Sequence, residues 1–183
     1  MKSSIRAAVL LSVAVLTLGL SACGEKIRPS VLQGIDTKHG PQQESWHSTV
    51  IISDSGRVQA KIIAGYIRKF DSPQETLLDS GVVVYFFNEL GKQTTTMTAL
   101  HGKVNERTYD IDAFGNVLVV SDDSTRLRSE RLFWDKQRRL IHTSDYVAIV
   151  SPKERVQGQG FESDQRLRNY KIFKVTAQVR PDK

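Results

Sequence analysis

The sequence predicts an all-β protein, built as an antiparallel sandwich or half-barrel. From Trp46 onward, short runs of alternating or β-branched residues are separated by turn residues at intervals of roughly 8–12 residues, which is typical of such folds. One stretch, residues 60–67, also fits the spacing of a helix, but Gly65 and the β-branched neighbours favour a strand. The 183 residues, 39% of them hydrophobic and 25% charged, suffice for one domain.

The first 23 residues predict export and lipid attachment. Lys2 and Arg6 precede an apolar run over residues 7–20, which is shorter than the ~20 residues of a membrane-spanning helix and matches a signal-peptide core. Residues 20–23 (LSAC) end this run with small residues before the single cysteine, the pattern of a bacterial lipoprotein signal. We therefore expect a signal peptide over residues 1–22 and a diacylglycerol group on Cys23. A short membrane anchor and an ordinary signal peptide are the alternatives.

A tether is expected between the lipid and the folded domain. Residues 23–45 are mostly polar, contain Gly and Pro and show no period, which is typical of a flexible linker. Each buried CH₂ of an acyl chain contributes ~0.8 kcal/mol, so two or three chains anchor a protein stably. The domain is therefore expected over residues 46–180, outside the cytoplasm and on a membrane surface.

The expected strands follow one another with turn residues between them. Residues 54–56 (DSG) have the composition of a hairpin turn, and residues 81–88 (GVVVYFFN) form a continuous β-branched and aromatic run. Residues 114–116 (FGN), 121–124 (SDDS) and 151–153 (SPK) mark further turns. The strands expected are 48–53, 57–66, 81–88, 94–101, 108–112, 117–121, 126–134, 140–143, 146–150, 157–162, 167–173 and 175–179.

A weak internal repeat runs through the middle of the chain. Residues 95–120 align without gaps on residues 125–150, so that apolar positions coincide. The coinciding residues include Val104 with Trp134, Ile111 with Ile141, and Val119 with Ile149. A repeated two-hairpin unit would build an extended sheet whose ends are open edges. Chance alternation, which many β-proteins share, is the alternative.

Nothing in the sequence has the pattern of a catalytic or metal site. The four histidines form neither His-x-His nor His-Glu-x-x-His, and a single cysteine can build neither a cysteine zinc site nor an intrachain disulfide. No Gly-x-Ser-x-Gly elbow occurs. The net charge of +6 comes from charges of alternating sign, without the interleaved aromatic residues of a nucleic-acid surface. We therefore expect no enzyme, no metal, no cofactor and no nucleic-acid partner.

Apolar residues occupy both faces of several expected strands. In residues 82–87 (VVVYFF) both alternating sets are apolar, and residues 117–120 and 132–134 repeat this pattern. The sheet is then either buried inside a sandwich or curved around an apolar groove that holds a lipid-like ligand. The basic residues between positions 126 and 139 alternate along a hairpin, which indicates either a solvated outer face or contact with an anionic partner.

This set of features resembles the LptC family, the periplasmic bridge of the lipopolysaccharide export machine. The resemblance covers residues 45–180 and implies an elongated antiparallel β-jellyroll or half-barrel with an open apolar groove. Family members make and break no bond. They accept lipopolysaccharide from an inner-membrane ABC transporter and pass it to a periplasmic LptA-like bridge protein, joining it edge strand to edge strand. The segments that carry the resemblance are 60–66, 82–87, 98–104, 114–117, 127–135, 156–164 and 167–168.

Two readings of the resemblance stay open beside the transfer role. The chain could be an LptA-like bridge subunit, because related bridge proteins share the fold and much of the pattern. It could also be a lipoprotein scaffold or adaptor of an envelope complex that carries no lipid. An open groove favours the transfer role, whereas a fully packed core favours the scaffold.

Alternation, combined with the resemblance, predicts which residues bind ligand and partner. The side chains expected to line the groove are Leu78, Val84, Phe86, Val104, Ile111, Val119, Leu132, Val147, Ile149, Phe161 and Ile172. An error of one residue in register would replace the whole set of a strand. Gly158 lies inside a strand-like segment, which indicates a bulge or a close backbone approach, or a contact with the transporter.

The resemblance also implies a location. It places the domain on the periplasmic side of the inner membrane, where better-known members are held by an N-terminal membrane helix and this chain by its expected lipid. Gly24 follows the expected lipidation site. Because retention in the inner membrane depends mainly on an Asp at that position, the outer membrane is the alternative.

Overall fold

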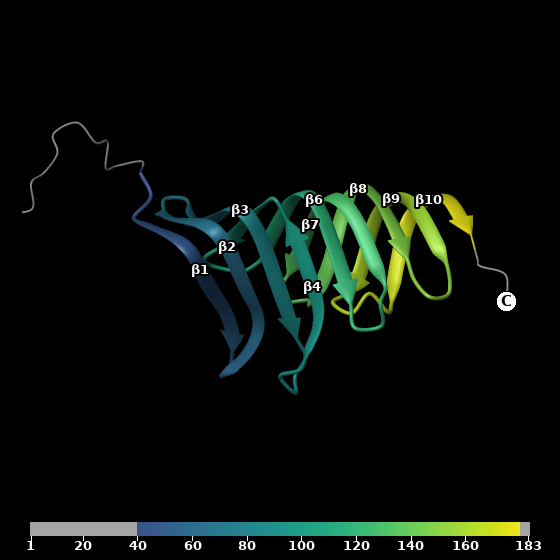
Figure 1. Ribbon diagram of the computed structural model, residues 1–183, viewed down its shortest axis with the longest axis horizontal. Helices are drawn as coiled ribbons and strands as arrows, with labels where there is room; N and C mark the ends of the chain where they lie inside the picture. Colours follow the sequence, from purple (N-terminus) through teal and green to yellow (C-terminus); the bar gives the residue numbers. More distant parts are fainter. Residues whose placement is uncertain (1–39, 180–183) are drawn as a thin grey trace, which may run out of the picture. The chain divides into compact units, whose positions relative to one another are not determined.

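The computed structural model describes residues 40–179, and every regular element in that range is a β-strand. The ten strands form one antiparallel sheet (Figure 1). They are β1 (Gln43–Asp54), β2 (Arg57–Asp71), β3 (Gln74–Phe87), β4 (Gln93–Ala99), β5 (His101–Asn105), β6 (Ile111–Ser121), β7 (Arg126–Asp135), β8 (Leu140–Val150), β9 (Arg155–Asp164) and β10 (Tyr170–Val179).

The order of strands in the sheet follows the order in the chain except at β5. The main path is β1-β2-β3-β4-β6-β7-β8-β9-β10, and β5 pairs with β3 and β6. β4 pairs with the C-terminal halves of these two neighbours, whereas β5 pairs with their N-terminal halves. β4 and β5 therefore act as one long strand interrupted at Leu100, and β1 and β10 are the two edges of the sheet.

The long strands bend where they cross one line through the sheet, which we call the crease. β3 crosses it at Ser80-Gly81 (φ 61° and 84°), and β6 crosses it at Gly115-Asn116 (φ 80° and 54°). In β2 the crossing point is Gly65, where an added Cβ would lie 2.6 Å from the carbonyl oxygen of Ser80. The remaining crossing points are His47 in β1, Leu100 between β4 and β5, residues 130–132 in β7, residues 144–145 in β8, Gly160 in β9 and Phe173 in β10.

Backbone hydrogen bonds continue across the sheet at the crease. The N–H of Gly81 donates to the carbonyl of Leu100 at 3.2 Å, and the N–H of Leu100 donates to the carbonyl of Gly115 at 2.9 Å. Glycine adopts positive φ without a Cβ penalty, and asparagine tolerates it better than most residues. The sequence thus allows the strands to turn sharply at this line without losing the ladder.

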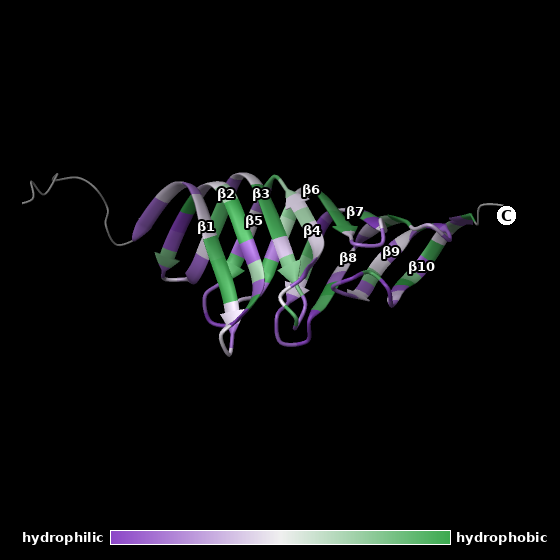
Figure 2. Cartoon of the chain, turned by 60° about the horizontal axis from the view of Figure 1, so that its bottom comes forward, coloured by the Kyte–Doolittle hydropathy of each residue, from purple (hydrophilic) through white to green (hydrophobic). Residues whose placement is uncertain are grey.

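The crease folds the sheet into two layers whose inner faces pack together. The strand halves on the β4 side form the first layer, and those on the β5 side form the second layer. Phe86 of the first layer packs against Trp134 of the second, with ring centroids 5.1 Å apart. The buried apolar residues of both layers belong to one cluster. Figure 2 shows hydrophobic residues along strands such as β2 and β3.

The predicted all-β antiparallel fold is confirmed, and residues 60–67 lie within β2 as predicted. Three pairs of predicted strands are wrong as separate elements, and one of these pairs forms β10. Residues 111–121 form the single strand β6, and residues 140–150 form the single strand β8. In β6 and β8, the Gly and Asx residues between the predicted pairs bend the strand at the crease instead of reversing the chain.

Other boundaries also differ from the prediction. Residues 74–80 belong to β3, where the buried Thr76 and Leu78 alternate with the more exposed Glu75, Leu77 and Asp79. β1 begins at Gln43, three residues inside the predicted tether, since Gln43 pairs with Lys69. β10 is one strand from Tyr170 onward, and residues 165–169 form a loop.

The thirty-residue repeat is confirmed by the strand pairing. Pairs in the first unit recur thirty residues later: Val104–Ile111 as Trp134–Ile141, and Met97–Val119 as Leu127–Ile149. β4 and β5 together therefore correspond to β7, and β6 corresponds to β8. The repeated unit is a hairpin that crosses the crease twice.

Gly65→Ala should lower the free energy of unfolding by about 1–3 kcal/mol, because the new Cβ would meet the backbone of Ser80 and the two strands would have to shift. Denaturant unfolding followed by tryptophan fluorescence measures this. Gly102→Ala is the matched control, since its nearest neighbour is the flexible end of Leu78 at 3.2 Å. An equal loss in both variants would contradict a special role for the crease.

Candidate functional site

The side chains predicted to line the groove come together on the inner faces of the two layers. Ten of the eleven are at most 1% exposed, and Ile172 is partly buried and packs against them. Alternation therefore selected the inward set on every strand concerned. The ten are Leu78, Val84, Phe86, Val104, Ile111, Val119, Leu132, Val147, Ile149 and Phe161. That these residues contact lipid stays a prediction.

The inner face contains further residues that the predicted set omitted. Trp134, Met97, Leu127 and Ile141 are all at most 1% exposed in the same cluster. The internal repeat could have predicted the burial of Trp134, because it aligns Trp134 with Val104. Together these side chains fill the space between the layers, so the interior is packed along much of its length.

A cavity of about 390 Å³ lies between the layers at the β1 end of the sheet. Val50 and Ile52 of β1 line one side, and Val104 and Tyr109 line the other. Tyr109 is 43% exposed, so this end of the interior reaches the surface. Among the predicted lining residues, Val104 thus borders both the packed core and an open space.

A charged cluster stands beside this cavity. Glu106 accepts hydrogen bonds from Lys69 at 2.9 Å and from the hydroxyl of Thr76 at 2.6 Å. Burial by itself would raise the pKa of Glu106, but the hydrogen bonds from Thr76 and Lys69 outweigh it and lower that pKa. The same bond raises the pKa of Lys69. The pair is therefore ionised at neutral pH, which gives an apolar opening a polar border.

The turns at the ends of the strands form two rims, one for each layer. The first rim consists of the turns 55–56, 88–92, 122–125 and 151–154. The second rim consists of the turns 72–73, 106–110, 136–139 and 165–169. The first rim terminates the first layer, and the second rim terminates the second layer. Together they form the boundary of the interior opposite the crease.

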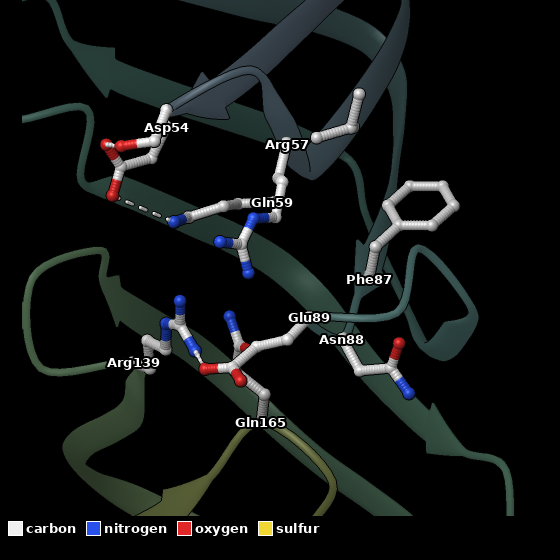
Figure 3. Close-up of a pocket in the computed structure, with 10 residues that line it drawn as sticks. Asp54, Arg57, Gln59, Phe87, Asn88, Glu89, Arg139 and Gln165 are labelled. Atoms are coloured by element: carbon white, nitrogen blue, oxygen red, sulfur yellow. Dashed lines mark hydrogen bonds and ion pairs between the residues drawn. The ribbon is translucent and has the colours of Figure 1, made fainter.

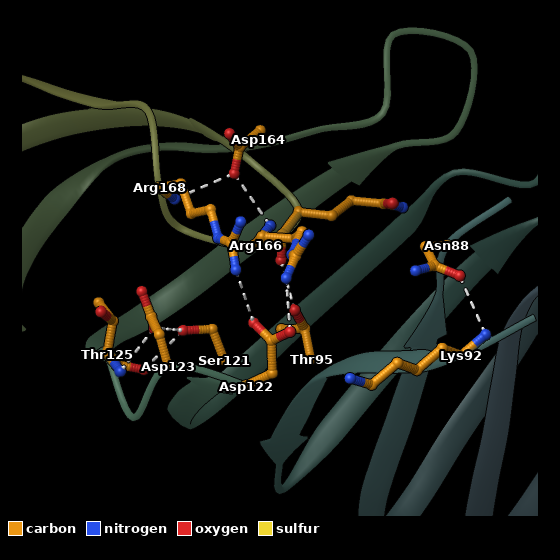
Figure 4. Close-up of polar contacts among 11 residues, drawn as sticks. Asn88, Lys92, Thr95, Ser121, Asp122, Asp123, Thr125, Asp164, Arg166 and Arg168 are labelled. Atoms are coloured by element: carbon orange, nitrogen blue, oxygen red, sulfur yellow. Dashed lines mark hydrogen bonds and ion pairs between the residues drawn. The ribbon is translucent and has the colours of Figure 1, made fainter. Parts of the chain in front are cut away.

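Ion pairs join the two rims over the middle of the sheet. Glu89 of the first rim accepts from Arg139 of the second at 2.9 Å. Asp122 of the first rim accepts from Arg166 at 2.6 Å and lies 3.7 Å from the guanidinium of Arg168 (Figure 4). Below them, the hydroxyl of Thr95 donates to the carbonyl of Gln165 at 2.6 Å. These contacts hold the rims together.

A further contact joins the rims near β10. The hydroxyl of Tyr170 donates to Glu154 of the first rim at 2.6 Å, and the amide of Gln178 donates to the same carboxylate at 2.7 Å. Burial and the hydrogen bond to Glu154 raise the pKa of Tyr170 to about 12. Tyr170 therefore stays protonated, and keeps its donor role, throughout the physiological pH range.

The basic residues of the 126–139 hairpin are mostly engaged within the domain. Arg131 binds Asp112, and its guanidinium lies 4.8 Å from the centre of the Phe133 ring. The hydrogen bond to Asp112 raises the pKa of Arg131. Arg138 lies 3.3 Å from Glu162. This pairing favours the solvated outer face over an anion-binding surface for that segment.

Both edges of the sheet expose apolar residues. Phe173, Val175 and Val179 of β10 are 54–62% exposed, and Trp46 and Ile51 of β1 are 60–63% exposed. Among the described strands, each edge strand has a neighbour on one side only, so its outer backbone groups can pair with another strand.

Gly158 is buried on β9 and pairs with Val175 of β10. A Cβ at this position would lie 2.3 Å from the carbonyl oxygen of Lys174 and 2.6 Å from a methyl carbon of Ile172. The predicted close backbone approach is present, and its neighbour is β10. An effect of Gly158 on a partner would therefore act through the position of β10.

Over residues 40–179, the structure contains no cluster of three or more His, Cys, Asp or Glu side chains placed to hold a metal ion. In the same range, no helix has the length and apolar character needed to span a membrane. The predicted signal peptide, Cys23 and Gly24 lie outside the described residues.

Comparison with known proteins identifies one family. The sequence model described as "Lipopolysaccharide-assembly, LptC-related" matches residues 13–180. No curated protein matches the chain. The family match therefore covers every described strand.

Proposed function

Because the chain belongs to the LptC family, whose role is in lipopolysaccharide transport in the cell envelope, we propose that it binds lipopolysaccharide and transfers it without enzymatic chemistry. It accepts the lipid from an inner-membrane ABC transporter and passes it to a periplasmic LptA-like bridge protein. The observation that carries this proposal is the continuous apolar inner face, which runs from β1 through β10.

The inner face suits acyl chains. Apolar side chains from both layers line it, and an acyl chain that replaces their mutual contacts keeps the same surface away from water. The cavity beside Val50 and Tyr109 provides the opening at the β1 end. Elsewhere the interior is packed, so acyl chains would enter as the rims part.

The two edges suit a chain of protomers. A strand of the transporter would add to β1, and a strand of the bridge protein would add to β10, each through backbone hydrogen bonds. The exposed apolar side chains of β10 would be covered by that addition. Lipid would then move along a continuous apolar surface from one subunit to the next.

A scaffold without lipid cargo is the second candidate. The packing of Trp134 against Phe86, both at most 1% exposed, favours it, because this part of the interior is filled. The two candidates differ in whether the inner face meets lipid in the cell. An LptA-like bridge role is less supported, since the family match is to LptC.

The proposed location is the periplasmic side of the inner membrane, where a lipid on Cys23 would hold the domain. Gly24 leaves the outer membrane as the alternative. In either place, the segment before β1 would connect the anchor to the edge that faces the transporter.

A photo-crosslinking residue at Val84 or Val119 should form an adduct with lipopolysaccharide in cells, because both side chains are fully buried on the inner face. The neighbours Val83 and Val120 have the opposite orientation and serve as controls. Tyr109 provides a partly exposed position beside the cavity, where a larger side chain should not disturb folding. Immunoblotting for lipopolysaccharide detects the adduct. Adducts from neither Tyr109 nor the buried positions would favour the scaffold.

Gly158→Arg should displace β10 and weaken association with the envelope partners, while the rest of the domain remains folded. The new side chain would overlap the backbone of Lys174, and such overpacking costs about 1–3 kcal/mol. Thermal melts and pull-down of the transporter and of the bridge protein measure the two effects. Gln159→Arg is the control, since Gln159 is exposed. Normal binding by Gly158→Arg would remove Gly158 from the partner site.

Cys23→Ala should abolish lipid attachment and release the protein from the membrane fraction, because the lipoprotein signal ends at the single cysteine. Metabolic labelling with a fatty-acid analogue measures attachment. Label that persists on the variant would show that the anchor lies elsewhere.

A further inference from the structure

A polar pocket of about 220 Å³ lies where the rims meet, beside the β1–β2 turn. Arg57 and Gln59 line it from β2, Glu89 from the β3–β4 turn, and Arg139 and Gln165 from the second rim (Figure 3). At ~30 Å³ per water, the pocket has roughly seven water volumes, the size of one sugar ring. It lies on the interior's boundary, between the apolar inner face and solvent.

Gln59 lines this pocket and carries an unpaired acceptor. The residue is 9% exposed, and its amide nitrogen lies 3.4 Å from a carboxylate oxygen of Asp54. Its carbonyl oxygen Oε1 is buried and has no hydrogen-bond partner within the described residues. A buried acceptor without a partner destabilises the free protein, so this atom favours a ligand that donates an O–H or N–H.

Two unpaired donors lie in the second layer. The indole nitrogen of Trp134 and the hydroxyl of Ser163 are buried and have no hydrogen-bond partner among residues 40–179. Trp134 of β7 and Ser163 of β9 both pair with Ile141 of β8 in the second layer, so they lie on either side of β8. The ring of Trp134 packs on Phe86, whose neighbour Phe87 lines the pocket. Donors at this depth suit the carbonyl groups that link acyl chains to a sugar.

The charges of the pocket suit a sugar phosphate better than a bare phosphate. Arg139 is already paired with Glu89, whereas Arg57 has no ion pair within the described residues and its guanidinium points into the pocket (Figure 3). Asp54 and Glu89 also line the pocket, so its formal charge is balanced. One free guanidinium can bind a phosphate oxygen, while Gln59 and the carboxylates accept from sugar hydroxyls.

We propose that this pocket binds the phosphorylated sugar of an acylated lipid, at the point where the sugar meets the acyl chains. Arg57 binds the phosphate, Gln59 accepts from the sugar, and Trp134 and Ser163 donate to the acyl carbonyls inside. This proposal rests on the proposed function, because the acyl chains are those of lipopolysaccharide within the apolar interior. It adds the position and orientation of the head group.

Binding of two lipids to the full-length protein tests the pocket. The probes are diphosphorylated lipid A and the same acylated disaccharide without phosphate. Arg57→Gln should weaken binding of the phosphorylated lipid about tenfold, the effect of losing one charge-assisted hydrogen bond, and leave the dephosphorylated lipid unchanged. Lys61→Gln is the matched control, since it removes a positive charge from the same strand outside this pocket.

Gln59→Leu separates a binding role from a structural one. It removes the buried unpaired oxygen together with the long 3.4 Å contact to Asp54, so the thermal midpoint should change little, while affinity for both lipids falls several-fold. A lower midpoint with unchanged affinity would overturn the role of Gln59 in binding. Inorganic phosphate should not displace the lipid at equal concentration, and displacement by phosphate alone would overturn the sugar phosphate assignment.

The outcomes also separate this proposal from the proposed function. If the unaltered protein binds both lipids and Arg57→Gln changes neither affinity, the pocket is wrong and lipid transfer stands. An equal loss for both lipids in Arg57→Gln likewise overturns the phosphate contact. If the unaltered protein binds neither lipid, the proposed function fails together with the pocket.

Discussion

The fold depends on one constraint: the strands of a ten-stranded sheet bend along a single line. With no helix in residues 40–179 to cover it, an unbent sheet would leave its apolar face in water. The crease lets the sheet cover itself, because each strand contributes one half to each layer. The glycines at 81 and 115 allow the sharp turn, and Leu100 carries the hydrogen bonds between them. Core, rims and edges all follow from this bend.

Because the crease extends to both edge strands, the folded cross-section does not close at either end. His47 of β1 lies on this line at one edge. Phe173 of β10, opposite Gly160 of β9, lies on it at the other edge. A strand added at either edge would meet a neighbour that is already bent and has its inner side turned toward the interior. The thirty-residue pairing repeat extends the sheet in the same manner within the chain. The sheet is therefore extended in the same way by a further hairpin within the chain and by a further subunit at its edge.

The inward residues could be predicted from the sequence, because a period of two fixes the face of each residue once a strand is recognised. The bends could not be predicted, because Gly115-Asn116 has the composition of a chain-reversing turn. A bend within a strand differs from such a turn only in hydrogen bonds to residues distant in sequence, such as the bond from Leu100. The N-terminal half of β3 was hidden by its polar residues. The rim contacts had no local signal either, since Glu89 and Arg139 are fifty residues apart.

The two boundaries of the interior differ in how strongly they hold. The rims are joined largely by partly exposed ion pairs, such as Arg139 with Glu89 at 48% and 67% side-chain exposure, and such pairs contribute about 0–1 kcal/mol each. The crease is joined by a backbone ladder and by a close approach of the strands at Gly65, where an added Cβ would meet the carbonyl oxygen of Ser80. The apolar contacts between the layers lose little when an acyl chain takes their place. If the layers separate to admit an acyl chain, they would part at the rims and pivot at the crease, and the sheet that forms the core would also act as the hinge.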